Sequence, residues 1–327
     1  MGQETWGIGV DLGGTKVKVA VVDARGKIHQ ELRQPTNVAG GPDRIIADIV
    51  EMVRKVLGQS PPSACAGLGV GVAGQITPDT GVVRFAPNLN WREVPFGDRL
   101  QATLNLPVVV TNDVRAATWG EWLHGSGRGV EDLICLFIGT GVGGGVVSGG
   151  RMLSGCTNTA GELGHMTTDL NGPRCTCGNR GCLEALAGGW AIARRGREAI
   201  REAPEAGKAL LKAAGLKEPV VLLDVTAKVV ADAAQAGDPL ARVIMDEVAQ
   251  ALIAGTVSLV NAFNPSRLIL GGGVIHGMPE LVDRIDRGIR QSALKTASEA
   301  LQVLPGKLKN DAGVVGAANL AIQSFAP

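Results

Sequence analysis

The sequence contains no tyrosine, and aromatic residues make up only 3% of its 327 positions. Charged residues are also sparse, at 19% against a typical share of about 25%. The 32 basic and 31 acidic residues leave a formal net charge of +1. This balance excludes the basic footprint of a nucleic-acid-binding protein and the polybasic segment of a membrane-surface protein.

Targeting and membrane segments are missing as well. The first ten residues, MGQETWGIGV, lack the basic and apolar regions of a secretory signal. Trp6 stands where an N-terminal acylation signal requires Ser or Thr. We find no apolar run near the roughly 20 residues that span a bilayer. We therefore expect a cytoplasmic protein with neither a membrane nor a nucleic acid as partner.

Glycine, in contrast, is abundant, with 47 residues in the chain, or about twice the average usage. The glycines follow no strict third-position period, which excludes collagen, and 45% hydrophobic residues exclude a disordered chain. Most of the excess falls in stretches at 9–14, 67–74, 139–150, 161–164, 178–189 and 271–273. Because glycine has no Cβ, we expect these stretches to leave the backbone open to ligands.

The hydrophobic pattern predicts an α/β protein with two lobes. Strands are expected at 6–12, 17–22, 27–33, 66–72, 108–110, 134–138, 144–148 and 267–270. Helices are expected at 45–57, over most of 183–262, and at 312–322. The strand, glycine turn and returning strand at 6–22 recur at 133–148, which is typical of a duplicated unit. We expect one lobe at 1–114, joined by the C-terminal helix 311–327, and a second at 115–310.

Two stretches match the G-x-G-x-x-G pattern, at 69–74 and 139–144. A dinucleotide fingerprint needs a helix directly after the glycines, and the residues that follow predict a turn and a strand instead. The sequence has no G-x-x-x-x-G-K-[ST] motif. Rossmann and P-loop nucleotide sites are therefore excluded as interpretations.

A glycine turn between two strands can still bind phosphate through successive backbone N–H groups. The turn Asp11-Leu-Gly-Gly-Thr-Lys16 has an acid at its entrance and Thr15 and Lys16 at its exit. Asp11 is a candidate for contact with hydrated Mg²⁺. The alternative is an ordinary tight hairpin, which the further glycine turns at 139–145 and 271–273 make less attractive.

Polar residues in two further stretches are candidate ligand contacts. Asn112 and Asp113 come directly after an apolar strand, where α/β proteins bind ligands. A carboxylate there can accept a hydroxyl proton during phosphoryl transfer, although Asp113 can equally cap the next helix. Asn88 and Trp91 suit a sugar site, with a buried Trp beside a turn Asn as the alternative.

Cys175, Cys177 and Cys182 lie within eight residues, and His165 precedes them in the stretch Gly-Glu-Leu-Gly-His. Three thiolates and one imidazole complete a tetrahedral zinc site. Since four protein ligands leave no open position, we expect the zinc to be structural. The alternative is three unrelated free thiols.

Taken together, these motifs resemble the ROK family (repressors, open reading frames and sugar kinases), and within it the ATP-dependent glucokinases. The matching elements occur in family order from residue 6 to about 275. They are DLGGTK at 11–16, PNL at 87–89, ND at 112–113, GE at 120–121, IGTGVGGG at 138–145, GELGH at 161–165, CTCGNRGCLE at 175–184 and GGG at 271–273.

The resemblance implies an actin-like ATPase fold, that is, a duplicated ribonuclease-H-like fold, with sugar and ATP in the cleft between the lobes. It implies that Asp113 is the general base that takes the proton of the sugar 6-hydroxyl. Implied sugar contacts are Gly74, Asn88, Asn112, Asp113, Glu162, His165 and Glu184. Implied nucleotide and phosphate contacts are Asp11, Gly13, Gly14, Thr15, Lys16, Gly139, Thr140, Gly141, Gly271 and Gly272.

The implied cofactors are ATP, Mg²⁺ and a structural Zn²⁺ held by His165, Cys175, Cys177 and Cys182. His165 is expected to bind zinc with one ring nitrogen and the sugar with the other. Cys156 and Thr157 depart from the residues expected in a typical glucokinase, which puts the sugar preference in doubt.

Glucose is the favoured hexose, with fructose, allose and N-acetylmannosamine as alternatives, and ATP is the default donor over polyphosphate. A sugar-responsive repressor is less favoured, because only five residues precede the first predicted strand and a DNA-binding domain needs more. A non-catalytic sugar-binding or zinc-scaffold protein is a third alternative. The family resemblance favours a homodimer or homotetramer.

Overall fold

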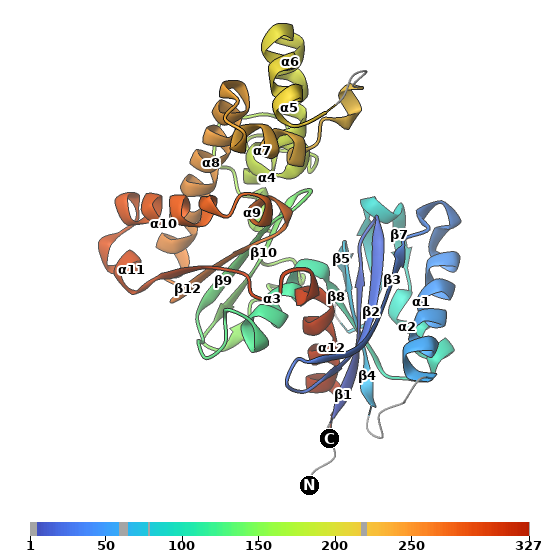
Figure 1. Ribbon diagram of the computed structural model, residues 1–327. Helices are drawn as coiled ribbons and strands as arrows, with labels where there is room; N and C mark the ends of the chain where they lie inside the picture. Colours follow the sequence, from blue (N-terminus) through green and yellow to red (C-terminus); the bar gives the residue numbers. More distant parts are fainter. Residues whose placement is uncertain (1–4, 59–64, 78, 217–220, 327) are drawn as a thin grey trace. The chain divides into compact units, whose positions relative to one another are not determined.

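The computed structural model describes residues 5–58, 65–77, 79–216 and 221–326. The chain forms two compact units (Figure 1). Unit 1 comprises Met1–Val130, Arg151–Gly161 and Gly306–Pro327, and unit 2 comprises Glu131–Gly150 and Glu162–Pro305. Unit 1 thus extends beyond residue 114, where the sequence placed the lobe boundary, and takes in a further segment at 151–161.

Unit 1 is built on a five-stranded sheet with the order β3-β2-β1-β4-β8. The hairpin of β1 (Trp6–Leu12) and β2 (Lys16–Asp23) is antiparallel, and β3 (Ile28–Pro35) continues it. On the other side, β4 (Cys65–Val72) and β8 (Val108–Asn112) run parallel to β1. The carboxyl ends of β1, β4 and β8 therefore lie at the same edge of the sheet.

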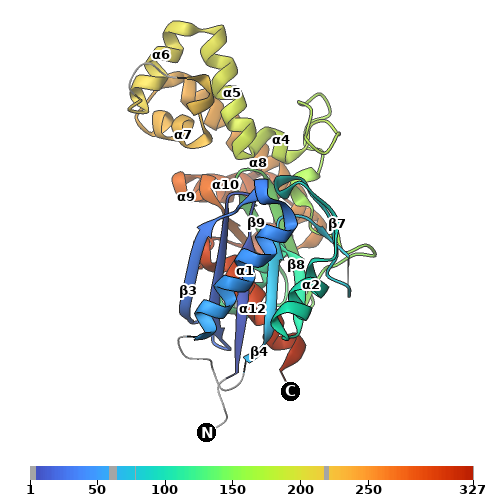
Figure 2. The same cartoon turned by 90° about the vertical axis from the view of Figure 1, so that its right-hand side faces the viewer.

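Helices cover both faces of this sheet. The amphipathic α1 (Gly41–Gly58) lies across one face together with α2 (Phe96–Leu104), and α12 (Ala312–Phe325) packs on the other (Figure 2). Next to α12 lies α3 (Asp113–His124), which follows β8. The aliphatic face of α1 and the inner side chains of β1, β2 and β4 form one continuous core.

The contact between α12 and the sheet is made by glycine. A Cβ at Gly69 would lie 1.8 Å from the carbonyl oxygen of Ala317, and one at Gly9 would lie 2.0 Å from that of Val314. Such distances are far below any real Cβ contact, so only glycine allows this approach. The expectation that the glycines of 9–14 and 67–74 serve ligands is wrong for these two, because a helix backbone occupies the space.

A small antiparallel sheet, β5-β6-β7, extends unit 1 after β4. It consists of β5 (Gln75–Ile76), β6 (Val83–Ala86) and β7 (Trp91–Val94). Trp91 is buried and meets Phe96 edge to face, with ring centroids 5.0 Å apart. Trp91 is thus a core residue, which agrees with the alternative to a sugar contact that the sequence left open.

Unit 2 carries four strands in the order β10-β9-β12-β13, and the two-residue β11 (Arg151–Met152), which completes this sheet, falls in the segment counted with unit 1. The hairpin of β9 (Leu133–Ile138) and β10 (Val142–Ser148) is antiparallel. Both β12 (Arg267–Gly271) and β13 (Gln302–Pro305) run parallel to β9. The strand order and directions match β2-β1-β4-β8 of unit 1, which confirms the predicted internal repeat.

The helices of unit 2 follow the hairpin. They are α4 (Leu183–Ala187), α5 (Gly189–Glu202), α6 (Pro204–Ala213), α7 (Ala227–Gln235), α8 (Pro239–Phe263), α9 (Gly273–Gly277), α10 (Glu280–Ser292) and α11 (Lys295–Ala300). The sequence predicted the helical content of 183–262 but assigned no element to 280–305.

The longest helix, α8, is apolar and long enough to span a membrane by length and composition, which the sequence analysis overlooked. Half of its most apolar window is buried inside the protein. It packs against α4, α5, α7 and α10 of its own unit. These contacts are typical of the core helix of a globular unit.

Candidate active site

The first glycine turn lies between β1 and β2 in unit 1. The Gly13 N–H donates to Lys16 O at 3.0 Å, and the Thr36 hydroxyl donates to Gly13 O at 2.7 Å. A Cβ at Gly14 would lie 2.7 Å from the carbonyl oxygen of Asn88. The structure therefore brings Asn88, which comes from the β6–β7 connection, against the predicted phosphate turn.

Asp11 is the next-to-last residue of β1, directly before the first glycine turn. Burial raises the pKa of its carboxyl group, against the opposing attraction of Lys16 and Lys18. A Cβ at Gly313 would lie 2.9 Å from the Asp11 carboxyl carbon, so the first turn of α12 closes over this group. A cation at Asp11 would offset the cost of its buried charge, so the residue suits a divalent metal.

Asn112 and Asp113 end β8 and begin α3. Asn112 is the N-cap, and its side-chain oxygen accepts from the N–H groups of Val114 and Arg115 at 2.9 and 3.2 Å. Its side-chain amide donates to Gly74 O at 3.3 Å. The structure thus joins Gly74, Asn112 and Asp113 at the carboxyl ends of β4 and β8; Asn112 is the N-cap, and Asp113 Oδ1 also accepts the Val114 N–H at 2.9 Å.

The second glycine turn connects β9 and β10 in unit 2. The Gly139 N–H donates to Gly141 O at 2.9 Å, and the N–H groups of Gly189 and Trp190 donate to the carbonyls of Gly139 and Thr140, both at 2.9 Å. Gly272 backs onto the same turn, since a Cβ there would lie 2.3 Å from Ile138 O, and its φ is +89°. Gly139, Thr140, Gly141, Gly271 and Gly272 therefore form one backbone-lined group.

His165, Cys175, Cys177 and Cys182 come together in unit 2, with their ligand atoms all within 4.8 Å of one another. The Sγ atoms of Cys177 and Cys182 are 3.7 Å apart, and His165 Nδ1 is 3.7 Å from Cys175 Sγ. A tetrahedral ion with Zn–S bonds of about 2.3 Å places its sulfur ligands about 3.8 Å apart. The four residues thus fit zinc, and the sulfurs are too far apart for a disulfide.

The thiols of this cluster differ in acidity. Burial, together with Cys177 and Cys175, raises the pKa of Cys182 to about 12, and burial also raises the pKa of Cys175. In contrast, the Asn179 N–H lowers the pKa of the exposed Cys177. Two buried thiols that resist ionisation are costly as thiolates unless a cation accompanies them, which agrees with a metal centre.

The two predicted acids of unit 2 flank this cluster. Glu162 is exposed and directly precedes the short helix η3 (Leu163–His165). This helix packs so closely against β10 that a Cβ at Gly164 would lie 1.9 Å from Val142 O. Glu184 lies in α4, next to Cys182, and accepts the Val142 N–H at 3.0 Å. The zinc cluster, Glu184 and the second glycine turn are therefore one connected arrangement.

Sequence reasoning missed two residues around these sites. The indole N–H of Trp190 donates to Glu184, and the Arg115 guanidinium donates to Asn158 O and Ser154 Oγ at 3.2 and 2.9 Å. Arg115 thereby ties the loop that contains Cys156 to the start of α3. The sequence offered only weak signals for these two residues, namely a Trp at the start of a predicted helix and an Arg two residues after Asp113.

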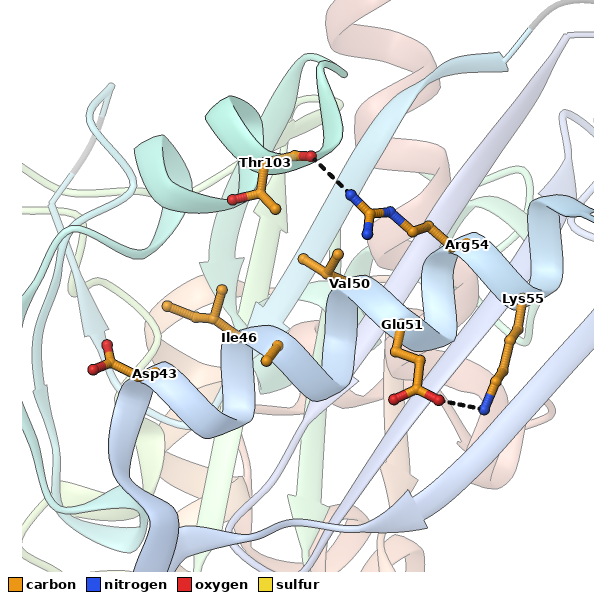
Figure 3. A pocket seen from close by; sticks show the side chains of 8 residues that line it. Asp43, Ile46, Val50, Glu51, Arg54, Lys55 and Thr103 are labelled. Carbon is orange, nitrogen blue, oxygen red and sulfur yellow. Dashed lines mark hydrogen bonds and ion pairs between the residues drawn. The ribbon is translucent and has the colours of Figure 1, made fainter.

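A groove runs along α1 beside the end of α2 (Figure 3). It is lined by Ile46 and Val50, and charged side chains border it, with Lys55 paired to Glu51 and Arg54 donating to Thr103 O. None of the predicted site residues lines it.

Comparison with known proteins decides the family, since the family model described as "ROK family" matches residues 7–324. The chain belongs to the ROK family. Among its ROK relatives, the glucokinase of Halalkalibacterium halodurans is 36% identical over 96% of this chain and 94% of its own. The glucokinase of Thermotoga maritima is 36% identical over 96% of both chains.

A solved ROK structure agrees. The glucokinase from Streptomyces griseus in complex with glucose and AMPPNP superposes with a TM-score of 0.82 at 35% identity, covering 97% of this chain and 99% of that one. The xylose repressor of Bacillus subtilis is also a relative, at 28% identity over 98% of this chain but 78% of the repressor. The actin-like fold predicted from the ROK resemblance is thereby confirmed.

Proposed function

We propose that this protein is an ATP-dependent hexose kinase that phosphorylates the 6-hydroxyl group, with glucose as the favoured substrate. Kinship with curated glucokinases over nearly the whole chain supports a sugar kinase of the ROK family. The single observation that carries the chemistry is Asp113. It stands at the carboxyl end of β8, directly after Asn112, which caps α3 and contacts Gly74.

Asp113 acts as the general base. Its carboxylate accepts the proton of the sugar 6-hydroxyl as that oxygen attacks the γ-phosphorus of ATP and the bond to the β,γ-bridging oxygen breaks. Most of the catalysis is positioning of the two reactants. The Asn112 cap and its bond to Gly74 O serve this purpose, because they fix the backbone on which Asp113 stands.

The two glycine turns bind the phosphates of ATP. In unit 1, the turn of Gly13, Gly14, Thr15 and Lys16 supplies a hydroxyl, an ammonium and backbone N–H groups other than that of Gly13, which bonds Lys16 O. In unit 2, Thr140 and Gly141 supply backbone N–H groups, Gly139 lines the phosphates while its own N–H bonds Gly141 O, and Gly271 and Gly272 contact the nucleoside. Asp11 would hold a hydrated Mg²⁺, which would neutralise charge on the phosphates when bound.

The hexose hydroxyls are held by Asn88, Asn112, Glu162, His165 and Glu184. The structure supports a division of labour at His165, because Nδ1 faces the cysteine cluster and Nε2 is left for the sugar. Zinc, when bound, stiffens the loop 165–184 and has no open position for Lewis-acid chemistry. We further propose a cytoplasmic homodimer or homotetramer.

Another hexose or amino sugar is the alternative substrate, and fructose, allose and N-acetylmannosamine are the candidates. The observation that favours this alternative is the loop with Cys156 and Thr157, which Arg115 ties to α3 and which departs from the expected glucokinase residues. A repressor with this domain is a second alternative, supported by the xylose repressor among the relatives.

A coupled kinase assay over these sugars, with ATP and polyphosphate as donors, tests the proposal. We expect ATP-dependent turnover that is fastest with glucose. Turnover of N-acetylmannosamine without turnover of glucose would refute the glucose assignment. Sugar-dependent DNA binding without any turnover would support the repressor.

A further inference from the structure

The Glu184 carboxylate receives hydrogen bonds from three separate segments of unit 2. Its Oε2 accepts the Val142 N–H from the second glycine turn at 3.0 Å. Its Oε1 accepts the indole N–H of Trp190 at 3.3 Å and the hydroxyl of Thr176, which lies in the cysteine loop, at 3.4 Å. The carboxylate is therefore the point at which the glycine turn, the cysteine loop and α5 meet.

The glycine turn leaves this carboxylate little room on the Oε2 side. A Cβ at Gly141 would lie 2.2 Å from Oε2, so the backbone of the turn packs directly on that oxygen. Further backbone bonds from Gly189 to Gly139 and from Trp190 to Thr140 hold α5 against the turn. The rotation of the carboxylate is then decided by what Oε1 contacts.

Of the two Oε1 donors, Trp190 is the firmly held one. Its ring packs against the buried cluster of Cys175, Cys182 and Ala185. The guanidinium of Arg194 lies over the ring, 5.7 Å from its centroid. In contrast, Thr176 is exposed and its bond to Oε1 is long. The indole thus offers Oε1 a donor whose direction is fixed by packing.

We propose that Trp190 is a positioning residue for the hexose, acting through Glu184. The indole N–H fixes the orientation of the carboxylate, so that its one remaining acceptor position, on Oε2, stays aimed at a sugar hydroxyl. Because Trp190 rests on two of the cysteines, it also transmits the order of the zinc loop to the carboxylate. This proposal rests on the proposed function, in which Glu184 binds the sugar.

The test is Trp190→Phe, which keeps an aromatic ring against the cysteines and removes only the N–H donor. Trp122→Phe is the matched control, since the Trp122 indole N–H donates to Val130 O at 2.9 Å in unit 1. We expect Trp190→Phe to raise the KM for glucose about tenfold, as losses of orienting partners commonly do. We expect kcat, the KM for ATP and the zinc content to stay within about twofold of wild type. Trp122→Phe should leave the KM for glucose unchanged.

Thr176→Val is the second variant, because this exposed side chain can lose its hydroxyl without disturbing the core. It should raise the KM for glucose by about twofold, less than Trp190→Phe, since the weaker donor is removed. Equal KM values in wild type and Trp190→Phe would overturn the proposal. So would a fall in kcat with unchanged KM, or equal effects of Trp190→Phe and Trp122→Phe.

If Trp190→Phe loses zinc or unfolds, the proposal depends on Thr176→Val alone, and an unchanged KM there overturns it. The proposed function fails in a distinguishable way. In that case the wild-type protein itself turns over none of the sugars, whatever residue stands at position 190.

Discussion

The two units share one strand order but differ on one face of their central strands. In unit 1, Gly9 and Gly69 bring the sheet onto the backbone of α12. In unit 2, the matching strands β9 and β12 have a buried apolar side chain at every position of 133–136 and 268–270, with no glycine among them. The same topology therefore tolerates either a backbone contact or a side-chain layer over its central strands.

The chemistry of the units differs at the ends of the matching strands. The edge strand β8 ends on Asn112 and leads into Asp113, whereas its counterpart β13 ends on Pro305. The turn after β1 has Asp11 and Lys16 on its own strands, whereas the turn after β9 takes its carboxylate, Glu184, from a distant helix. Duplication thus repeated the scaffold, and each unit gained its own charged groups.

The largest expected effect is that of Asp113→Asn, because unit 2 has no acid at the matching position to replace it. We expect kcat to fall about 10³-fold, within the usual range for a general base, while glucose affinity measured by calorimetry is retained. Asp98→Asn, on an exposed position of α2, is the control and should keep kcat. Full activity in Asp113→Asn contradicts the assignment of the base.

Gly69→Ala tests the packing difference. A Cβ there meets the carbonyl of Ala317, which cannot move without shifting α12, so we expect a loss of about 3 kcal/mol in the free energy of unfolding. In Gly255→Ala, the atoms nearest to the new Cβ in α8 belong to the Leu183 side chain, whose end can move, and we expect a change below about 1 kcal/mol. Urea unfolding measures both, and equal losses break the comparison.

Cys177→Ser tests the loop that is unique to unit 2. We expect zinc to fall from about one per chain to near zero, because three ligands remain for a four-ligand ion, and activity to fall about 100-fold. Metal analysis and the kinase assay provide the readouts. Cys156→Ser, which lies outside the cluster, is the control and should keep its zinc. Full activity in a zinc-free Cys177→Ser protein contradicts the structural role.

We expect the smallest effect from Asp11→Asn, which should raise the thermal stability slightly. Burial raises the pKa of Asp11 above its ordinary value of 3.8, so its ionisation opposes folding at every pH above the raised value. The neutral amide removes this cost, and Tm should rise by about 2–4 °C per kcal/mol gained. The gain should shrink as the pH falls toward 3.8, and activity should be lost. A lower Tm at pH 7 contradicts this account.

The strands, the repeat and the cysteine cluster could be predicted from the sequence, because each depends on local spacing. Two features could not. The glycines at 9 and 69 look like ligand-binding glycines in sequence, and only the position of α12, at the far end of the chain, shows that they serve packing. The partnership of Trp190 with Glu184 depends on how α4 and α5 meet, which no periodicity in the sequence records.

The buried Glu121 indicates where new chain termini could be introduced. The carboxylate of Glu121, near the end of α3, accepts hydrogen bonds from two parts of the chain. One is the segment just after α3, through the Ser126 N–H, and the other is the segment before α12, through the N–H groups of Lys307 and Leu308. The first part leads out of unit 1 and the second leads back into it. If the chain were opened at the exposed Gly129, the new end after α3 would still be held to the segment 307–308 by the Glu121 carboxylate. Gly129 is therefore a suitable site for new termini in a circular permutant.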